Sequence, residues 1–336
     1  MIIIKSYIFL FIIFFLCKKI FKKLISKHYN DHQKLAGNEY VTLIGGLIFL
    51  SFLLINYQNL DKLIIIFSFL IFLLGILSDT NFLQSPKKRL LFQILIIFVF
   101  IHFADLNLKD LRSDFLNIMI SNSFLNHVFL TFCFLILING SNFIDGLNGL
   151  NLGYFLLIFL VILKLNIMGD IYIDQNKIFI FMIPIIFLLI MNFFNYLYLG
   201  DSGAYLIGFL VGTFLVETNY SNLLISPYFI ALLLWYPAFE NFFSILRKIF
   251  RKFDPVLPDT FHLHQLIFKY FKSKKFLLNI YSNQISTIVI LTYNFIIFFI
   301  SLSHFNKTKF LILLIITNIF VYLTTYFILE KKFQKT

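Results

Sequence analysis

The chain has few charged residues and few cysteines. Only 13% of its 336 residues are charged, whereas 60% are hydrophobic and 48 are phenylalanine. The 2 cysteines, Cys17 and Cys133, both fall in apolar runs, which argues against a disulfide framework and against a thiolate metal site. A single folded core cannot hide so many apolar side chains, so a water-soluble globule is excluded. The composition indicates a polytopic membrane protein.

Apolar runs of roughly the length of a membrane-crossing helix recur along the whole chain. We expect them at residues 1–17, 41–56, 62–77, 90–104, 124–138, 150–168, 177–191, 203–218, 223–241, 284–302 and 310–329. The first run lacks the small-residue cleavage pattern of a signal peptide, and its basic residues follow the apolar stretch, so it is expected to be a retained span. The predicted fold is an all-α polytopic membrane helix bundle of about eleven transmembrane helices, forming a single integral-membrane domain over residues 1–336.

Basic residues dominate the charge balance, with 28 Lys and Arg against 16 Asp and Glu. If the runs alternate across a membrane, most of these basic residues fall in the connections on one face. The positive-inside rule makes that face cytoplasmic, which places the N-terminus outside and the C-terminus in the cytoplasm. A basic surface beside anionic lipid accounts for the charge. We therefore expect no nucleic-acid partner.

Isolated carboxylates stand at the ends of runs on the predicted cytoplasmic face. Asp79 directly follows the third run, and Asp201 precedes the eighth within Gly200-Asp201-Ser202-Gly203. A carboxylate at a helix start either caps the helix or holds a hard cation. For Asp79, an ordinary solvated loop acid is the alternative interpretation.

The densest polar segment lies between two apolar runs, from residue 139 to residue 150. Its polar side chains recur at steps of three, with three glycines among them: Asn139, Asn142, Asp145 and Asn148. A regular helix would spread these side chains over half a turn, so only a helix end bent by the glycines would bring them to one pocket. Amides suit a nucleobase or sugar, and amide oxygens suit Mg²⁺. Helix-end capping is the alternative.

A pair of histidines, His262 and His264, lies in the last predicted cytoplasmic loop, after Pro255, Pro258 and Asp259. The prolines favour extended backbone, and Asp259 is placed to cap a short helix. Two histidines two residues apart do not share a helix face, and the sequence offers no further zinc ligands beside them. Contact with an anion such as phosphate is favoured, with Arg247 and Arg251 nearby in the sequence. A solvated basic loop is the alternative.

Carboxylates, amides and histidines on one face together suit a hard cation with a phosphorylated ligand. In a transfer from a diphosphate, Mg²⁺ and basic side chains would offset the charge that develops in the transition state. A lipid co-substrate would explain why the site lies in a membrane protein. An ion-coupled membrane transporter remains open, because broken helices and intramembrane acids also form transport sites.

These segments together resemble the polyprenyl-phosphate N-acetylhexosamine-1-phosphate transferases of glycosyltransferase family 4. The resemblance covers residues of about 41–281 and runs in family order through Gly45-Gly46, Gly75 to Gln93, Asn139 to Leu150, Asn192 to Gly203, Pro237 to Lys248 and Asp259 to His264. It implies transfer of a HexNAc-type sugar 1-phosphate from a UDP-sugar to undecaprenyl (polyprenyl) phosphate, with release of UMP. It further implies a Mg²⁺ requirement, with Mn²⁺ as a substitute, and a homodimer in the bacterial inner (cytoplasmic) membrane whose active site faces the cytoplasm.

The resemblance also assigns roles to residues of this chain. It implies that Asp79, near the lipid phosphate, and Asp145 are catalytic, and that Asp201 and Asn142 bind the metal ion. It implies substrate binding by the remaining candidates: Asn139, Asn148, Asn192, Arg89, His262, His264 and Lys34.

Two details of the resemblance bear on the activity and its pathway. Ser78-Asp79 stands where the family usually has two adjacent aspartates, so a catalytically impaired family member is an alternative. The histidine segment resembles the N-acetylglucosaminyl branch more than the peptidoglycan branch. This favours an enzyme that initiates synthesis of a cell-envelope polysaccharide such as lipopolysaccharide.

Overall fold

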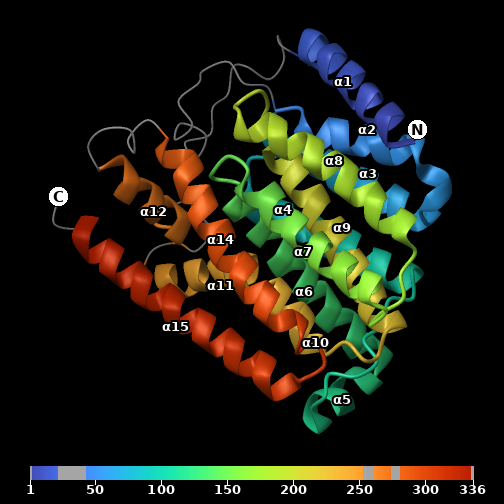
Figure 1. The fold of residues 1–336 in the computed structure, drawn as a ribbon, viewed down its shortest axis with the longest axis vertical. Helices are drawn as coiled ribbons and strands as arrows, with labels where there is room; N and C mark the ends of the chain where they lie inside the picture. Colours follow the sequence, from blue (N-terminus) through green and yellow to red (C-terminus); the bar gives the residue numbers. More distant parts are fainter. Residues whose placement is uncertain (1, 22–42, 253, 255–259, 274–280, 334–336) are drawn as a thin grey trace.

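The structure, a computed structural model, is an almost entirely helical bundle (Figure 1). It describes residues 2–21, 43–252, 254, 260–273 and 281–333. The predicted substrate residue Lys34 and the predicted helix cap Asp259 lie outside these ranges, as do Pro255 and Pro258. The helices of the described residues are α1 (Ile2–Phe21), α2 (Gly45–Ile55), α3 (Lys62–Asp79), α4 (Pro86–Phe103), α5 (Asp114–Ser121), α6 (Ser123–Ile144), α7 (Leu150–Met168), α8 (Gln175–Phe193), α9 (Gly200–Ser221), α10 (Pro227–Leu233), α11 (Trp235–Phe250), α12 (Leu263–Lys272), α14 (Ser282–Leu302) and α15 (Thr308–Phe333).

The predicted all-α membrane bundle is confirmed. Each of the predicted apolar runs overlaps one of these helices, except the run at 223–241, which overlaps two. Of the helices described, 6 are long and apolar enough to cross a membrane, or up to 7 if the bent pair of α10 and α11 forms one span. The total of about eleven spans and their orientation in the membrane stay predictions.

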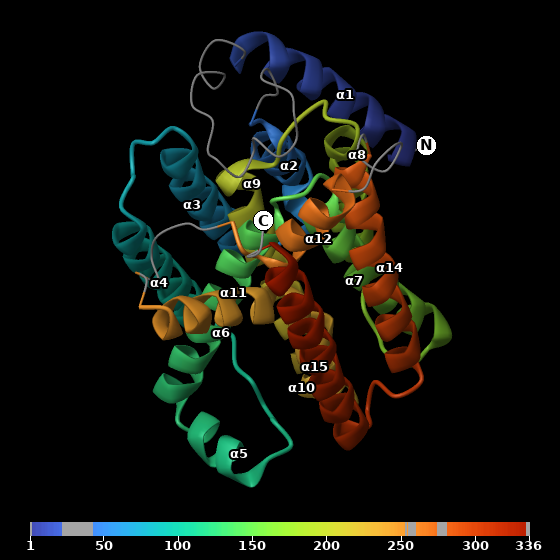
Figure 2. The same ribbon diagram turned by 90° about the vertical axis from the view of Figure 1, so that its left-hand side faces the viewer.

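Helix α9 lies at the centre of the bundle and is buried along almost its whole length. Glycines let α2 and α3 approach its backbone closely. A Cβ atom on Gly75 would lie 2.6 Å from the backbone nitrogen of Ser202, and one on Gly46 would lie 2.6 Å from that of Gly203. Real Cβ atoms do not approach so closely. The start of α9 is therefore held by direct backbone packing against α2 and α3 (Figure 2).

Arg112 links its own connection to two others at one end of the bundle. Its Nη1 donates to the carbonyl of Asn306 at 2.9 Å, and its Nη2 donates to those of Leu223 and Leu224, both at 3.1 Å. The connection between α4 and α6 contains the short helix α5, at the bottom of Figures 1 and 2. The side of the membrane on which these connections lie stays a prediction.

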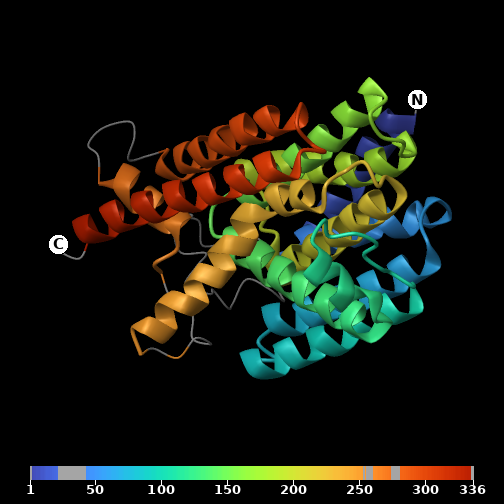
Figure 3. The ribbon, with the colours of Figure 1, turned by 90° about the horizontal axis from the view of Figure 1, so that it is seen from below.

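The run predicted at residues 223–241 is not one straight span. It divides at Leu234 into α10 and α11, whose axes differ by 72°. Pro237 gives the physical reason, because a proline ring clashes with the carbonyl four residues earlier and so disfavours a straight helix through this point, whereas the first turn of a new helix accepts it. Helix α11 consequently runs obliquely to α14 and α15 (Figure 3).

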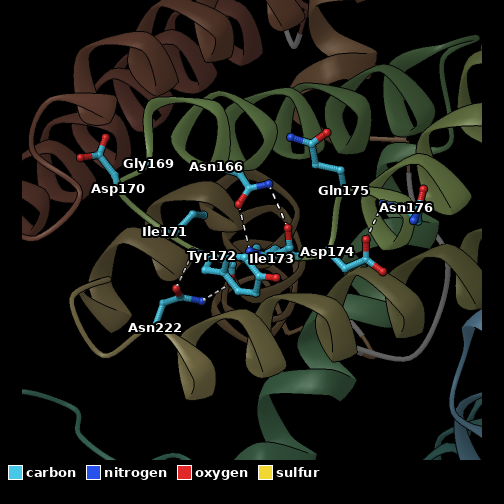
Figure 4. Close-up of a pocket in the computed structure, with 10 residues that line it drawn as sticks. All are labelled: Asn166, Gly169, Asp170, Ile171, Tyr172, Ile173, Asp174, Gln175, Asn176 and Asn222. Atoms are coloured by element: carbon cyan, nitrogen blue, oxygen red, sulfur yellow. Dashed lines mark hydrogen bonds between the residues drawn. The ribbon is translucent and has the colours of Figure 1, made fainter.

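A polar hollow of about 730 Å³ lies at the far end of α9 from Asp201, beside the connection between α7 and α8 (Figure 4). The amides around it bind the protein backbone. Asn166 donates to the carbonyl of Ile173 at 2.9 Å, and Asn222 accepts from the backbone N–H of Tyr172 at 2.9 Å. We assign these amides to holding the connection in place.

The contact between α3 and α9 leaves no room for a methyl group, so Gly75→Ala should separate the two helices. Overpacking of this kind costs about 1–3 kcal/mol or more. We expect a clearly lower thermal unfolding midpoint in detergent. Leu73→Ala is the matched control, because Leu73 is 38% exposed on the same helix. Equal midpoints for Gly75→Ala and the unsubstituted protein would contradict the close contact.

Candidate active site

The carboxylate of Asp79, the last residue of α3, caps the start of α9. Its Oδ1 accepts the backbone N–H of Asp201 at 2.8 Å, and its Oδ2 accepts that of Ser202 at 3.1 Å. The first N–H groups of a helix lack partners within the helix, and the helix dipole favours a negative charge beside them. Gly200 is required at this contact, because its φ is 74° and a Cβ would lie 2.8 Å from Asp79 Oδ2. Asp79 therefore has a structural role in addition to the predicted catalytic one.

Asp201 is the point at which four helices meet. Its Oδ2 accepts a hydrogen bond from Ser78 at 2.5 Å and one from Arg89 Nη1 at 3.1 Å. Its Oδ1 accepts a hydrogen bond from Asn142 Nδ2 at 2.7 Å. Arg89 also donates to the hydroxyl of Ser78. The structure thus brings together the predicted metal ligands Asp201 and Asn142 with Arg89, from α9, α6 and α4.

The residues around Asp201 fit a hard divalent cation. The Asp201 side chain is 18% exposed, and the guanidinium of Arg89 already places a positive charge against it. Among the residues described, no three His, Cys, Asp or Glu side chains are grouped to hold a metal ion. Mg²⁺ usually takes only one or two carboxylates and completes its shell with water and substrate phosphates. The Asp201 carboxylate and the Asn142 amide oxygen are suitable donors for such an ion.

Asp145 follows the last residue of α6 and faces the same negative cluster. Burial raises the pKa of Asp145 well above its ordinary value, and the neighbouring charges of Asp201 and Asp79 raise it further. These carboxylates repel one another, so the cluster favours a bound cation or a proton. Asp145 thus lies within the electrostatic reach of Asp79 and Asp201, and its catalytic role stays a prediction.

The polar segment from residue 139 to residue 150 does not converge on one pocket. Helix α6 continues through Ile144, so the helical rotation still separates its side chains. Asn139 turns toward α4 and donates to Gln93 Oε1 at 2.9 Å. Asn148 donates to Asn195 Oδ1, and its backbone N–H donates to Asn283 Oδ1 at 3.0 Å. Only Asn142 and Asp145 of this segment lie beside the carboxylates.

Asn192 also has a structural role. Its side-chain oxygen accepts the backbone N–H of Gly149 at 2.5 Å, and its Nδ2 donates to the carbonyl of Leu197 at 3.0 Å. It thereby joins the α6–α7 turn to the α8–α9 connection. The structure gives the amides of Asn139, Asn148 and Asn192 protein partners, and the substrate contacts expected for them stay predictions.

The two histidines lie together at the start of α12. His262 is the residue before the helix and His264 is in its first turn. Their rings stack, with centroids 5.5 Å apart and planes at 18°. The His262 ring lies 5.0 Å from the ring of Phe143, which is part of the polar segment. The change from extended backbone to helix at residue 262 brings together two side chains that would diverge on a regular helix.

Glu240 is the site residue that the sequence analysis missed. It is fully buried in α11, and its Oε1 lies 2.9 Å from His262 Nδ1 and accepts the backbone N–H of Leu263 at 3.1 Å. A buried carboxylate needs a hydrogen-bond or charge partner. In the sequence, the signal for this pairing was a single glutamate in an aromatic stretch, 22 residues before the first of the two histidines. Arg247 and Arg251 bind Tyr326 and Glu330 of α15, respectively. These contacts explain the positions of the two arginines without a bound anion.

His264 connects this cluster to the turn that carries Asp145. A Cβ on Gly146 would lie 2.7 Å from His264 Nε2, so the imidazole lies directly against that turn. Burial lowers the pKa of His264 below its ordinary value, which favours the neutral ring. The histidines therefore border the turn that carries Asp145.

Comparison with known proteins agrees with this geometry. The glycosyl transferase family 4 pattern matches residues 62–219, the stretch from α3 to α9 that carries Asp79, Arg89, Asn142 and Asp201. Over these residues the chain is similar to glycosyl transferase family 4. It is 29% identical over 282 residues to a phospho-N-acetylmuramoyl-pentapeptide-transferase of Prochlorococcus marinus, covering 74% of this chain and 76% of the relative. It is 25% identical over 214 residues to a probable undecaprenyl-phosphate N-acetylglucosaminyl 1-phosphate transferase of Bacillus subtilis, covering 59% of this chain and 55% of the relative.

Replacement of Asp79 by asparagine should weaken the cap on α9, the central helix of the bundle. An amide has only one acceptor oxygen, so one of the two backbone N–H groups would face an NH₂ group. An unsatisfied buried donor costs about 1–3 kcal/mol. We expect Asp79→Asn to lower the unfolding midpoint in detergent.

Asp61→Asn is the control for that measurement. Asp61 caps the exposed start of α3 through one oxygen, and asparagine caps a helix about as well as aspartate does. If both variants unfold at the same temperature, Asp79 does not stabilise α9.

The raised pKa of Asp145 predicts a pH-dependent stability. A carboxyl group whose pKa is raised by folding contributes its full stability below its unfolded pKa, and loses it as the pH rises through the folded value. Asparagine carries no charge, so Asp145→Asn should gain stability over the unsubstituted protein as the pH rises from 4 to 8. Unfolding midpoints across this range test the expectation, with exposed Asp114→Asn as the control. A difference that does not change with pH would contradict it.

Proposed function

We propose that this protein transfers a HexNAc-type sugar 1-phosphate from a UDP-sugar to undecaprenyl (polyprenyl) phosphate and releases UMP. The observation that carries the proposal is the convergence of Ser78, Arg89, Asn142 and Asp201 at the capped start of α9. This cluster lies within the family match. The names of both relatives describe transferases, and one names undecaprenyl phosphate and N-acetylglucosaminyl 1-phosphate.

The reaction needs positioning and charge stabilisation more than proton removal. A phosphate oxygen of the lipid attacks the phosphorus attached to the sugar, and the bond from that phosphorus to the oxygen of UMP breaks. A phosphate monoester with a second pKa near 6 is largely ionised at pH 7 and needs no base. Asp79 would act by fixing the start of α9, and Arg89 would stabilise negative charge on the phosphates. Mg²⁺, held by Asp201 and Asn142, would neutralise the diphosphate charge when bound.

An apolar groove of about 300 Å³ is suited to the lipid chain. It lies between α6, α10, α11 and α15, and its lining includes Phe132, Ile136, Trp235, Phe239, Phe242 and Ile319. Its surface is almost wholly apolar, as a polyprenyl chain requires. Helix α11 forms a wall of the groove and carries Glu240 toward the histidines. The groove would therefore hold the lipid beside the reacting phosphates.

The donor and pathway extend the proposal beyond the general reaction. We place the enzyme at the start of cell-envelope polysaccharide synthesis, with UDP-N-acetylglucosamine as the first donor to test, in the bacterial inner membrane with the site facing the cytoplasm. The resemblance of the histidine segment to the N-acetylglucosaminyl branch supports this choice. The two relatives differ in the substrates that their names imply, so the donor has to be measured.

The purified protein should release UMP from a UDP-HexNAc donor when undecaprenyl phosphate and Mg²⁺ are supplied. Asp201→Asn removes the charge that would hold the metal ion, and we expect a loss of about 100-fold or more in turnover. Chelation of Mg²⁺ should abolish release, and Mg²⁺ or Mn²⁺ should restore it. Asp61→Asn, which caps the far end of α3, is the matched control.

Two outcomes of this assay would contradict the proposal. Absence of UMP with every donor tested would favour an impaired family member, for which Ser78 in place of an aspartate is the structural reason, or a transporter. Full activity of Asp201→Asn would overturn the metal assignment while leaving the reaction in place.

A further inference from the structure

Glu240 is placed between the two histidines. Its Oε1 lies 2.9 Å from His262 Nδ1, and its Oε2 lies 4.0 Å from His264 Nδ1. Oε1 also accepts the backbone N–H of Leu263 at 3.1 Å. The stacked rings thus present the same nitrogen, Nδ1, to one carboxylate. Because imidazole Nδ1 and Nε2 lie on different edges of the ring, both Nε2 atoms face away from Glu240.

Part of this cluster is buried without hydrogen bonds. Within the described part of the chain, both ring nitrogens of His264 and the Oε2 atom of Glu240 have no partner. His264 and Glu240 are both 0% exposed. Buried polar atoms without partners are rare in folded proteins, and those that persist call for an explanation such as a functional role or an unseen ligand. The unpaired His264 Nε2 lies against Gly146, beside Asp145.

We propose that Glu240 is a positioning residue that sets both histidines for the phosphates of the nucleotide sugar. Its carboxylate accepts Nδ1–H from His262 and, after a small approach of the two side chains, from His264. The negative charge of Glu240 favours the imidazolium form of each ring when the diphosphate is bound, so that Nε2–H, directed toward the turn that carries Asp145, donates to a phosphate oxygen. The diphosphate is the part of the UDP-sugar whose two negative groups match two neighbouring N–H donors. This inference rests on the proposed transferase function for the identity of the ligand.

The position of Glu240 also explains why it lies on α11. The break at Leu234 turns α11 across the bundle, so the helix directs Glu240 to α12 on one side and lines the apolar groove on another. No other acidic residue occurs in α11. A carboxylate at this position reaches both rings without joining the cluster around Asp201.

The test compares Glu240→Gln and Glu240→Asp with the unsubstituted full-length protein in detergent. Gln has the same shape, but offers one acceptor oxygen and no negative charge. We expect kcat/KM for the UDP-sugar to fall about 10–100-fold, the range typical when a residue that orients a histidine is replaced. Affinity for the UDP-sugar without lipid acceptor should fall too. Glu240→Asp keeps the charge on a side chain one methylene shorter, and should recover part of both losses.

Glu217→Gln is the matched control, since Glu217 pairs with Lys177 at 2.5 Å near the far end of α9. Its kcat/KM should equal that of the unsubstituted protein. A purely structural role for Glu240 would lower the yield and unfolding midpoint of Glu240→Gln, while the folded fraction kept its affinity and kcat/KM. That result would overturn the proposal.

A spectroscopic measurement keeps the proposal testable even if Glu240→Gln does not fold. Histidine ¹⁵N chemical shifts report which ring nitrogen carries hydrogen, and the 7 histidines of the chain can be assigned through His262→Gln and His264→Gln. We expect hydrogen on Nδ1 of His262 in the unsubstituted protein, and hydrogen on both Nδ1 and Nε2 of His262 and His264 when UDP-sugar is added. Hydrogen on Nε2 alone in both residues, with the donor present, would overturn the assignment.

The measurements separate this inference from the proposed function. If no UDP-sugar is turned over or bound by the unsubstituted protein, the transferase function fails, and the shifts measured without ligand still decide whether Glu240 orients His262. If turnover is found and Glu240→Gln retains full kcat/KM, the function stands and the role of Glu240 is rejected.

Discussion

The contact between the Asp79 carboxylate and the first N–H groups of α9 is the interaction on which the rest of the site depends. It fixes the end of α3 against the start of α9, and it does so at the residue that carries the Asp201 carboxylate. Asp201 in turn receives hydrogen bonds from α3, α4 and α6. Without the cap, the Asp201 carboxylate would not be fixed at the position where these three helices can bind it. A helix dipole and a carboxylate therefore organise the polar chemistry of a largely apolar bundle.

The charge balance around Asp201 is unusual because Ser78 stands where the family usually has a second aspartate. The Ser78 hydroxyl donates to Asp201 and accepts from Arg89, so it joins an anion and a cation without adding charge. Asp79, Asp145 and Asp201 remain as negative groups, opposed by the Arg89 guanidinium. A further carboxylate at position 78 would increase their mutual repulsion and the demand for a bound cation. The substitution thus reduces the electrostatic cost of the cluster when no substrate is bound.

Much of the fold was predictable from the sequence because apolar length and composition determine membrane-helix structure. The helical nature of every run followed from that, as did the gathering of Asp79, Asp201 and the histidines at one end. The directions of Asn139 and Asn148 did not, because they depend on how far α6 continues before it breaks and on which helices pack beside it. Glu240 was missed for a related reason. Its partners are 22 and 23 residues away along the chain, and local pattern does not pair them.

The glycine contacts beneath the carboxylates have a consequence for how the protein meets its substrates. At Gly46 and Gly75 the main chain packs directly on the main chain of α9, so rotation of a side chain cannot let these helices slide. The depth of Asp79 and Asp201 within the bundle is therefore set by the width of a polypeptide backbone. Side-chain movement near the site is therefore left to the aromatic and imidazole rings of Phe143, His262 and His264. In the proposed reaction, phosphate groups would meet carboxylates held at a fixed depth, and only the aromatic and imidazole side chains could adjust to their shape.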